Sequence, residues 1–331
     1  MKMKRLPVSV LTLALLALVS LNVHAQSAAT DPLQMLPASD AVMYVEAKRV
    51  LTETLPRALA GDAARLAQIN ADIDRFKQQT GIDARSFERI AVATRYGKSA
   101  SGATTMEPVA VARGTFNAGT IVAMMRLASK GKYTEQKYGG KTVYTFSLND
   151  QVRMFGLLKM RITEASFVAL DNQTLAFGTP EMTRAAVDAH AGKGRVSTEL
   201  VQMTTRSAGA LAAFGGTVPA SAAQDLNFGN EEVTRSIRSV KYIFGALGQT
   251  AKGYDMQTTL RTGTAEEATS LNDTINAVRS LSGMLTDYLK GDRKTLAENA
   301  FKTLQVTKQN NDVQIRLEVA QSDLATILRG L

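Results

Sequence analysis

Residues 239–289 read SVKYIFGALGQTAKGYDMQTTLRTGTAEEATSLNDTINAVRSLSGMLTDYL. Two β-rich runs flank a turn at residues 249–253, and the longest amphipathic run of the chain follows them. Its apolar residues recur at intervals of three and four, which places them on one helical face. A strand pair followed by a helix that lies across it can bury a core of its own. This face comprises Leu271, Ile275, Val278, Leu281, Leu285 and Tyr288.

An earlier part of the chain repeats this order of hairpin, helix, hairpin and helix. The sequence therefore predicts an α+β fold with two similar halves, each an antiparallel sheet with helices packed on one face. The two sheets can also join or pack closely. An internal duplication explains the order, but α+β chains also repeat a hairpin and a helix without common ancestry. The corresponding segments are 89–116 with 239–263, 118–129 with the long helix, and 161–191 with 304–331.

The N-terminus has the three-part pattern of a secretory signal. A short cationic segment precedes an apolar core at residues 6–21, and Val23-His24-Ala25 fits a signal-peptidase site. The alternative is an uncleaved membrane anchor, but the core is short for a membrane span. We expect export to the periplasm or the extracellular medium, with no transmembrane segment left after cleavage. The expected organisation is signal peptide 1–25, flexible leader 26–35, first half 36–192 and second half 193–331, divided at Gly192-Lys193-Gly194.

Composition excludes several kinds of chemistry. The chain has no cysteine, and the 306 residues after the signal contain a single histidine, His190. Disulfides, thiolate nucleophiles and multi-histidine metal sites are therefore not expected. Cleavage removes Lys2, Lys4 and Arg5 and no acid, so the formal charge falls from +9 to +6. Without a long basic run or interleaved aromatic residues, nucleic-acid binding is not expected either. The sequence predicts no cofactor and no metal.

Short motifs suggest chemistry that their context does not support. Ser129 and Lys132 match Ser-x-x-Lys, and 147–149 and 261–263 echo the other elements of penicillin-recognising serine enzymes. In those enzymes the nucleophile begins a buried helix, whereas Ser129 is expected at a helix end before Gly131. Residues 138–142 resemble the end of a phosphate-binding loop, but Glu135 occupies the position of its first glycine. A tight hairpin turn explains Gly139 and Gly140 better.

The other candidates also have ordinary structural interpretations. Asp72 and Asp74 fit a solvated helical face better than a metal site, since no calcium-type loop surrounds them. His190 fits a helix C-terminus better than a general base. Two groups remain. The first is a group of lysines that either keep an edge strand from pairing with another sheet or contact an anion. It comprises Lys130, Lys132, Lys137 and Lys141. The second is a group of methionines that either fill the core or line a groove for lipid. It comprises Met124, Met125, Met154, Met160 and Met284.

Several short stretches resemble a group of exported bacterial proteins of unknown function. They are Leu36-Pro37-Ala38-Ser39-Asp40 with Tyr44-Val45, Arg113-Gly114-x-Phe116, Tyr138-x-Gly140, Val143-Tyr144 and residues 175–181. The resemblance spans residues 36–190. It implies an envelope or extracellular protein and brings no catalytic residues with it.

The expected function is a non-enzymatic binding or interaction protein of the cell envelope, with an unknown protein or lipid partner. One alternative is a carrier or chaperone for lipid or outer-membrane clients, which apolar helix residues exposed in the folded protein would favour. A second alternative is a serine hydrolase that uses Ser129 and Lys132. The sequence singles out no catalytic, cofactor-binding or metal-binding residue.

Overall fold

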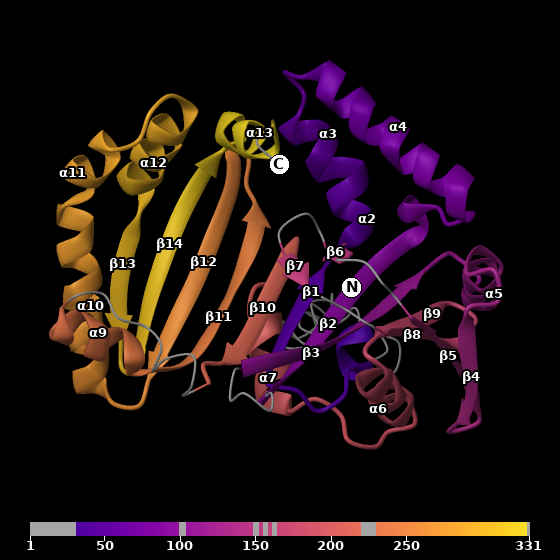
Figure 1. Ribbon diagram of the computed structural model, residues 1–331. Helices are drawn as coiled ribbons and strands as arrows, with labels where there is room; N and C mark the ends of the chain where they lie inside the picture. Colours follow the sequence, from indigo (N-terminus) through magenta and orange to yellow (C-terminus); the bar gives the residue numbers. More distant parts are fainter. Residues whose placement is uncertain are drawn as a thin grey trace, which may run out of the picture.

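A large antiparallel β-sheet forms the body of the protein (Figure 1). The computed structural model describes residues 31–98, 104–147, 152–154, 158–160, 164–219 and 230–329. The strands are β1 Ala41–Val45, β2 Phe87–Lys98, β3 Thr104–Gly114, β4 Tyr133–Tyr138, β5 Lys141–Ser147, β6 Val152–Met154, β7 Leu158–Met160, β8 Glu164–Asp171, β9 Thr174–Gly178, β10 Ala212–Thr217, β11 Val240–Gln249, β12 Gly253–Thr262, β13 Gln305–Gln309 and β14 Asp312–Ala320.

Twelve of these strands form one sheet in the order β13-β14-β12-β11-β10-β1-β2-β3-β9-β8-β5-β4, and β6 pairs with β7 separately. Strands β1 and β10 meet at the centre, where Ala41 pairs with Gly216 and Val45 with Ala212. The sheets of the two halves therefore join into one through the β1–β10 ladder, a possibility that the sequence leaves open. From this junction the order β2-β3-β9-β8 on one side matches β11-β12-β14-β13 on the other.

The helices begin and end at residues suited to those positions. Asp62 accepts a hydrogen bond from the backbone of Arg65 at the start of α4, and Gly81 ends this helix with φ 72°. Thr264 and Glu267 form a capping box at the start of α10. The helices are η2 Pro32–Met35, α2 Ala47–Arg49, the π-turn η3 Val50–Thr54, α3 Leu55–Ala58, α4 Ala63–Thr80, η4 Ala84–Ser86, α5 Ala118–Ala128, α6 Pro180–His190, α7 Thr198–Thr205, α9 Glu231–Arg238, α10 Ala265–Ser280, α11 Ser282–Asp287, α12 Asp292–Thr303 and α13 Gln321–Arg329.

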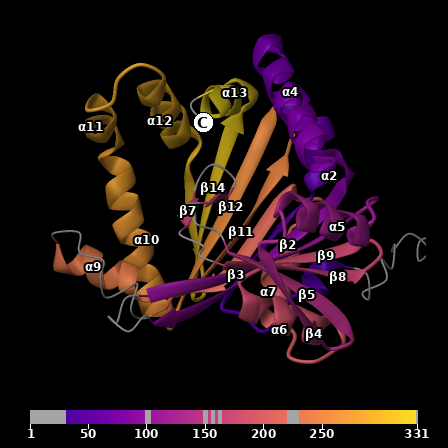
Figure 2. The same ribbon diagram turned by 45° about the vertical axis from the view of Figure 1, so that its right-hand side comes forward.

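Helices cover both faces of the sheet, which corrects the expectation that they lie on one face. Neighbouring residues of a strand point to opposite faces. Leu175 of β9 packs with Ile121 of α5, whereas the next residue, Ala176, belongs to the core cluster that contains Met182 of α6. Helix α10 lies on the same face as α5, and α7 lies on the same face as α6 (Figure 2). We call these the α5/α10 face and the α6/α7 face.

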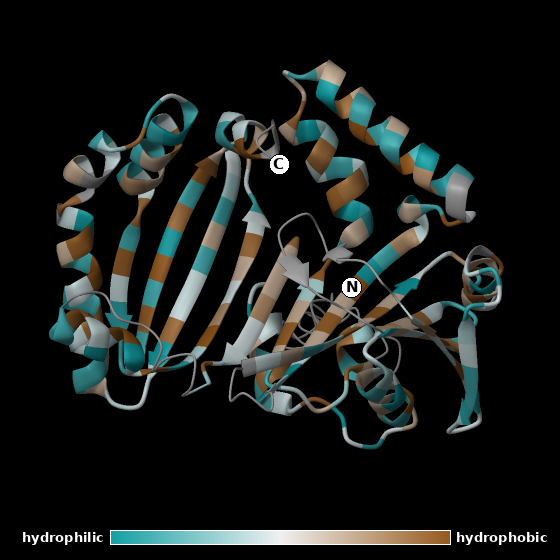
Figure 3. Cartoon of the chain, in the orientation of Figure 1, coloured by the Kyte–Doolittle hydropathy of each residue, from teal (hydrophilic) through white to brown (hydrophobic). Residues whose placement is uncertain are grey.

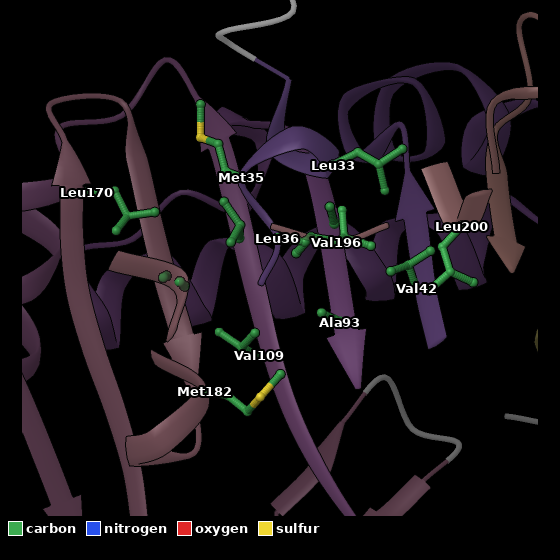
Figure 4. Close-up of a cluster of buried hydrophobic side chains, with 14 of the residues drawn as sticks. Leu33, Met35, Leu36, Val42, Ala93, Val109, Leu170, Met182, Val196 and Leu200 are labelled. Atoms are coloured by element: carbon green, nitrogen blue, oxygen red, sulfur yellow. The ribbon is translucent and has the colours of Figure 1, made fainter. Parts of the chain in front are cut away.

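The residues before β1 belong to the core rather than to a flexible leader. Leu33, Met35 and Leu36 are each 3 % exposed or less, and they pack with the α6/α7 face in the largest buried cluster (Figure 4). The carbonyl of Leu36 also accepts a hydrogen bond from the backbone of Val196. The expected leader 26–35 therefore extends too far, since its last four residues form the helix η2.

Strand β14 shows which face of the second half is covered. Val313, Ile315, Leu317 and Val319 alternate with Asp312, Gln314, Arg316 and Glu318 (Figure 3). The apolar set points to the α5/α10 face, where Val313 packs with Leu271 of α10. The polar set leaves the opposite face of β14 to solvent, as expected for an antiparallel sheet.

The long amphipathic run packs against the sheet only through its first part, which corrects the prediction of one continuous core-facing stripe. Leu271 is buried and Ile275 is partly buried against the sheet. The helix breaks at Leu281, between α10 and α11, and beyond this point Leu281 is 53 % and Tyr288 is 82 % exposed. The side chain of Leu285 lies outside the described residues. No helix in the described parts of the chain is long and apolar enough to span a membrane.

Candidate functional site

An apolar depression lies on the α5/α10 face at the centre of the sheet. Its volume is about 320 Å³, within the range of small-molecule sites. We call it the central hollow. Its lining comes from five adjacent strands, β11, β10, β1, β2 and β3, and consists of Ala41, Val42, Met43, Val92, Thr94, Tyr96, Met106, Pro108, Phe214, Gly215, Gly216, Thr217 and Ile243.

Small residues open the hollow at the β1–β10 junction. Gly216 pairs with Ala41, and a Cβ atom at Gly216 would lie 2.7 Å from the Cβ of Ala41. On the next strand, Gly245 lies beneath the ring of Phe214, so a side chain there would displace this ring. Glycine within a strand commonly marks such a close approach. Small residues of adjacent strands therefore shape the floor of the hollow.

The few polar groups of the hollow are uncharged. They belong to Thr94, Tyr96 and Thr217. Burial and the nearby Asp40 carboxylate both raise the pKa of Tyr96, so its phenol stays protonated at neutral pH. Asp40 itself is engaged, because its carboxylate accepts a hydrogen bond of 2.7 Å from the backbone N–H of Tyr96. No lining residue carries a charged side chain. Such a lining suits an uncharged, apolar group.

Among the described residues, the serine and the arginine of the serine-enzyme motif make separate structural contacts. The hydroxyl of Ser129 donates a hydrogen bond of 2.7 Å to the carbonyl of Arg126 at the end of α5. Arg261 lies on β12 in the other half, where it makes a bidentate ion pair with Asp312. Leu148 and Asn149 of the third element lie outside the described residues. Ser129 therefore serves as a helix cap, and Arg261 ties β12 to β14.

The glycine pair forms the hairpin turn between β4 and β5, as predicted. Gly139 and Gly140 both have positive φ, and a Cβ at Gly139 would come within 2.7 Å of Val187 in α6. Lys137 lies on β4, which is an edge strand of the sheet, whereas Lys141 is the first residue of β5. Lys137 donates a hydrogen bond to Thr142, so it stabilises the hairpin.

The carboxylates suspected of metal binding form ion pairs instead. Asp72 lies 2.9 Å from Arg75, and Asp74 lies 2.7 Å from Arg85. Within the ranges that the structure describes, no group of three or more histidine, aspartate and glutamate residues could hold a metal ion.

His190 ends α6 as predicted and is half-buried. Burial lowers its pKa below the ordinary value of 6.5. The unfolded chain then binds more protons than the folded chain, so stability is lost as pH falls through 6.5 towards the folded pKa. In urea titrations from pH 7.5 to 5.5, we expect the His190→Gln variant to lose less stability than the natural protein. An unchanged slope would show that His190 plays no part in this loss.

The methionines divide between core and surface. Met125 of α5 is partly buried against the cluster that contains Leu175, whereas Met284 is 63 % exposed on α11. The side chains of Met154 and Met160 lie outside the described residues. The two methionines of the central hollow, Met43 and Met106, were not among those singled out from the sequence. The glycine pair after Phe214 was a usable signal for the hollow, because glycine is unusual inside a strand.

Comparisons with known proteins add little to this description. No protein-family model and no curated relative matches the sequence. Among solved structures, crystal form III of TP0453 is similar, with 11 % identity, a TM-score of 0.47, and coverage of 91 % of this chain and 99 % of that one. Crystal form I of TP0453 has 11 % identity, a TM-score of 0.43, and coverage of 91 % and 97 %. Similarity at this level supports no conclusion about this chain.

Proposed function

We propose that this chain is an exported, non-enzymatic binding protein that holds the hydrocarbon part of a lipid in the central hollow. The observation that carries the proposal is the lining, which is apolar apart from two threonines and a protonated tyrosine. A site built to hold a charged metabolite would need a paired or hydrogen-bonded charge. A hydrocarbon chain has no such requirement.

A carrier is also favoured over a purely protein-binding module by the helices beside the sheet. Exposed apolar helix residues are the feature that separates these two functions, and Leu281 and Met284 are both more than half exposed. Catalysis is not part of the proposal, because Ser129 and Arg261 serve structural roles in different halves.

We further propose that the two halves arose by duplication and that residues 1–25 direct export. The matching strand orders on either side of the β1–β10 junction support the first idea. The cationic segment, the apolar core and the site at Ala25 support the second. An interaction module with no lipid ligand is the other candidate function.

Native mass spectrometry of the protein purified from its own envelope tests the proposal. We expect a stoichiometric added mass that solvent extraction removes and that lipid analysis identifies as an acyl-chain compound. A clean mass of the ligand-free chain, unchanged after incubation with envelope lipids, would favour the interaction module. A mass that retains residues 1–25 would contradict cleavage of the signal.

A further inference from the structure

We infer that the end of the α10–α11 segment is a docking surface for an anionic lipid membrane. This apolar tip consists of Val278, Leu281, Met284, Tyr288 and Leu289, each at least 36 % exposed. It comprises the last turns of α10, α11 and the start of the connection to α12 (Figure 1). The inference is independent of the central hollow, since none of these residues lines it.

The tip is a formed structure with a buried side and an exposed side. Thr286 is 4 % exposed, and its hydroxyl donates a hydrogen bond to the carbonyl of Gly283. Helix α11 packs against α12, and Lys294 of α12 lies 3.0 Å from Asp287. Met284 and Tyr288 point outwards, at 63 % and 82 % exposure. Such large apolar side chains are costly in water unless something covers them.

Basic residues outnumber acidic ones in the segment that carries the tip, whereas Glu266 and Asp273 of α10 line a pocket beside Val278 and Leu281. Segment 278–302 contains five lysines and arginines and three acids, which leaves a positive balance. Asp287 and Lys294 form an ion pair, so together they add no net charge to the segment. Lys290 and Arg293 are exposed and make no ion pair with other described residues. Apolar side chains beside lysine and arginine are typical of segments that lie in the interface of an anionic membrane.

The same charges argue against a second copy of this chain as the occupant. A symmetric contact through the tip would bring the Lys290 and Arg293 side chains of two molecules close together. Like charges placed opposite each other across an interface are unfavourable. A membrane with anionic headgroups instead supplies opposite charge at the level where Tyr288 and Leu289 would enter the apolar layer.

Co-sedimentation with vesicles of phosphatidylcholine containing 30 % phosphatidylglycerol tests the inference on the full chain. Replacing Met284 and Tyr288 by serine should lower vesicle partitioning at least tenfold, because two large apolar side chains are lost from the contact. Replacing Lys290 and Arg293 by glutamine should weaken it about fivefold per charge at low salt. The matched control replaces Met124 and Leu127, which are exposed on α5, by serine and should change partitioning less than twofold.

Three results would overturn the inference. One is failure of the natural protein to bind these vesicles. Another is an equal loss of binding in the tip and control variants. The third is a dimer, seen by light scattering, that the Met284→Ser/Tyr288→Ser variant converts to a monomer, since a second copy would then cover the tip. The Ala41→Phe variant, which fills the central hollow, should bind vesicles as the natural protein does. The vesicle experiment therefore tests the tip separately from the proposed lipid binding in the hollow.

Discussion

Replacing Leu33, Met35 and Leu36 together by alanine is expected to leave the protein largely unfolded. All three side chains are buried in the main core cluster. Truncation of a buried leucine or methionine to alanine typically costs about 2–5 kcal/mol. Even with incomplete additivity between neighbours, the combined loss is comparable to the whole stability of a protein, about 5–15 kcal/mol.

Urea unfolding followed by circular dichroism measures this effect. The matched control is the Leu281→Ala/Met284→Ala/Tyr288→Ala variant, which removes three apolar side chains of similar size from exposed positions. For each surface replacement, we expect the free energy of unfolding to change by no more than about 0.5 kcal/mol. A stable, cooperatively folded core variant would contradict the assignment of residues 32–36 to the core and would restore the predicted flexible leader.

Replacing Ala41 by phenylalanine is expected to abolish binding of an apolar probe. Ala41 lines the central hollow opposite Gly216, and these two small residues open it. An aromatic ring at this position would occupy the space that a hydrocarbon chain needs. Fluorescence titration with the uncharged probe N-phenyl-1-naphthylamine should show affinity at least tenfold weaker, because a loss of about 1.4 kcal/mol already has this effect.

Two further variants make this result interpretable. Thr307→Phe adds the same ring to an exposed position of β13, outside the hollow, and should leave probe binding unchanged. Ile243→Arg places a charge at a partly exposed position of the lining and should weaken binding even if Ala41→Phe lowers the melting temperature. Unchanged probe affinity in both hollow variants would place the binding site elsewhere.

Local features of this fold could be predicted from the sequence, whereas long-range features could not. The hairpin β11–β12 follows from its β-rich runs and turn, and the β4–β5 turn follows from Gly139 and Gly140. No local pattern in the sequence shows that β1 pairs with β10. The alternation of side chains along a strand shows which of them are buried, but it does not identify the neighbouring strand. Helix α9 was not predicted, since residues 231–238 are mostly polar and carry no long apolar stripe.

The candidate sites illustrate the same limit. Apolar spacing placed Leu271 and Tyr288 on one helical face, but spacing does not reveal where the sheet beneath the helix ends. Tyr288 is therefore exposed although its position in the pattern matches that of buried Leu271. The central hollow was not predicted because five strands from both halves line it. Residues 215–217, which form the last part of β10, contain two glycines and so lack the pattern of a buried strand.

The β1–β10 ladder also has a kinetic consequence. Ala41 and Gly216 are separated by about half of the chain, so the centre of the sheet cannot close until most of the protein has been made. Folds dominated by such distant pairings fold slowly, because the entropy of closing a long loop is lost before the pairing stabilises it. During this delay β1 and β10 each present an unpaired edge, which is a site for aggregation. Newly synthesised chains should therefore depend on protection by chaperones until these two strands have met.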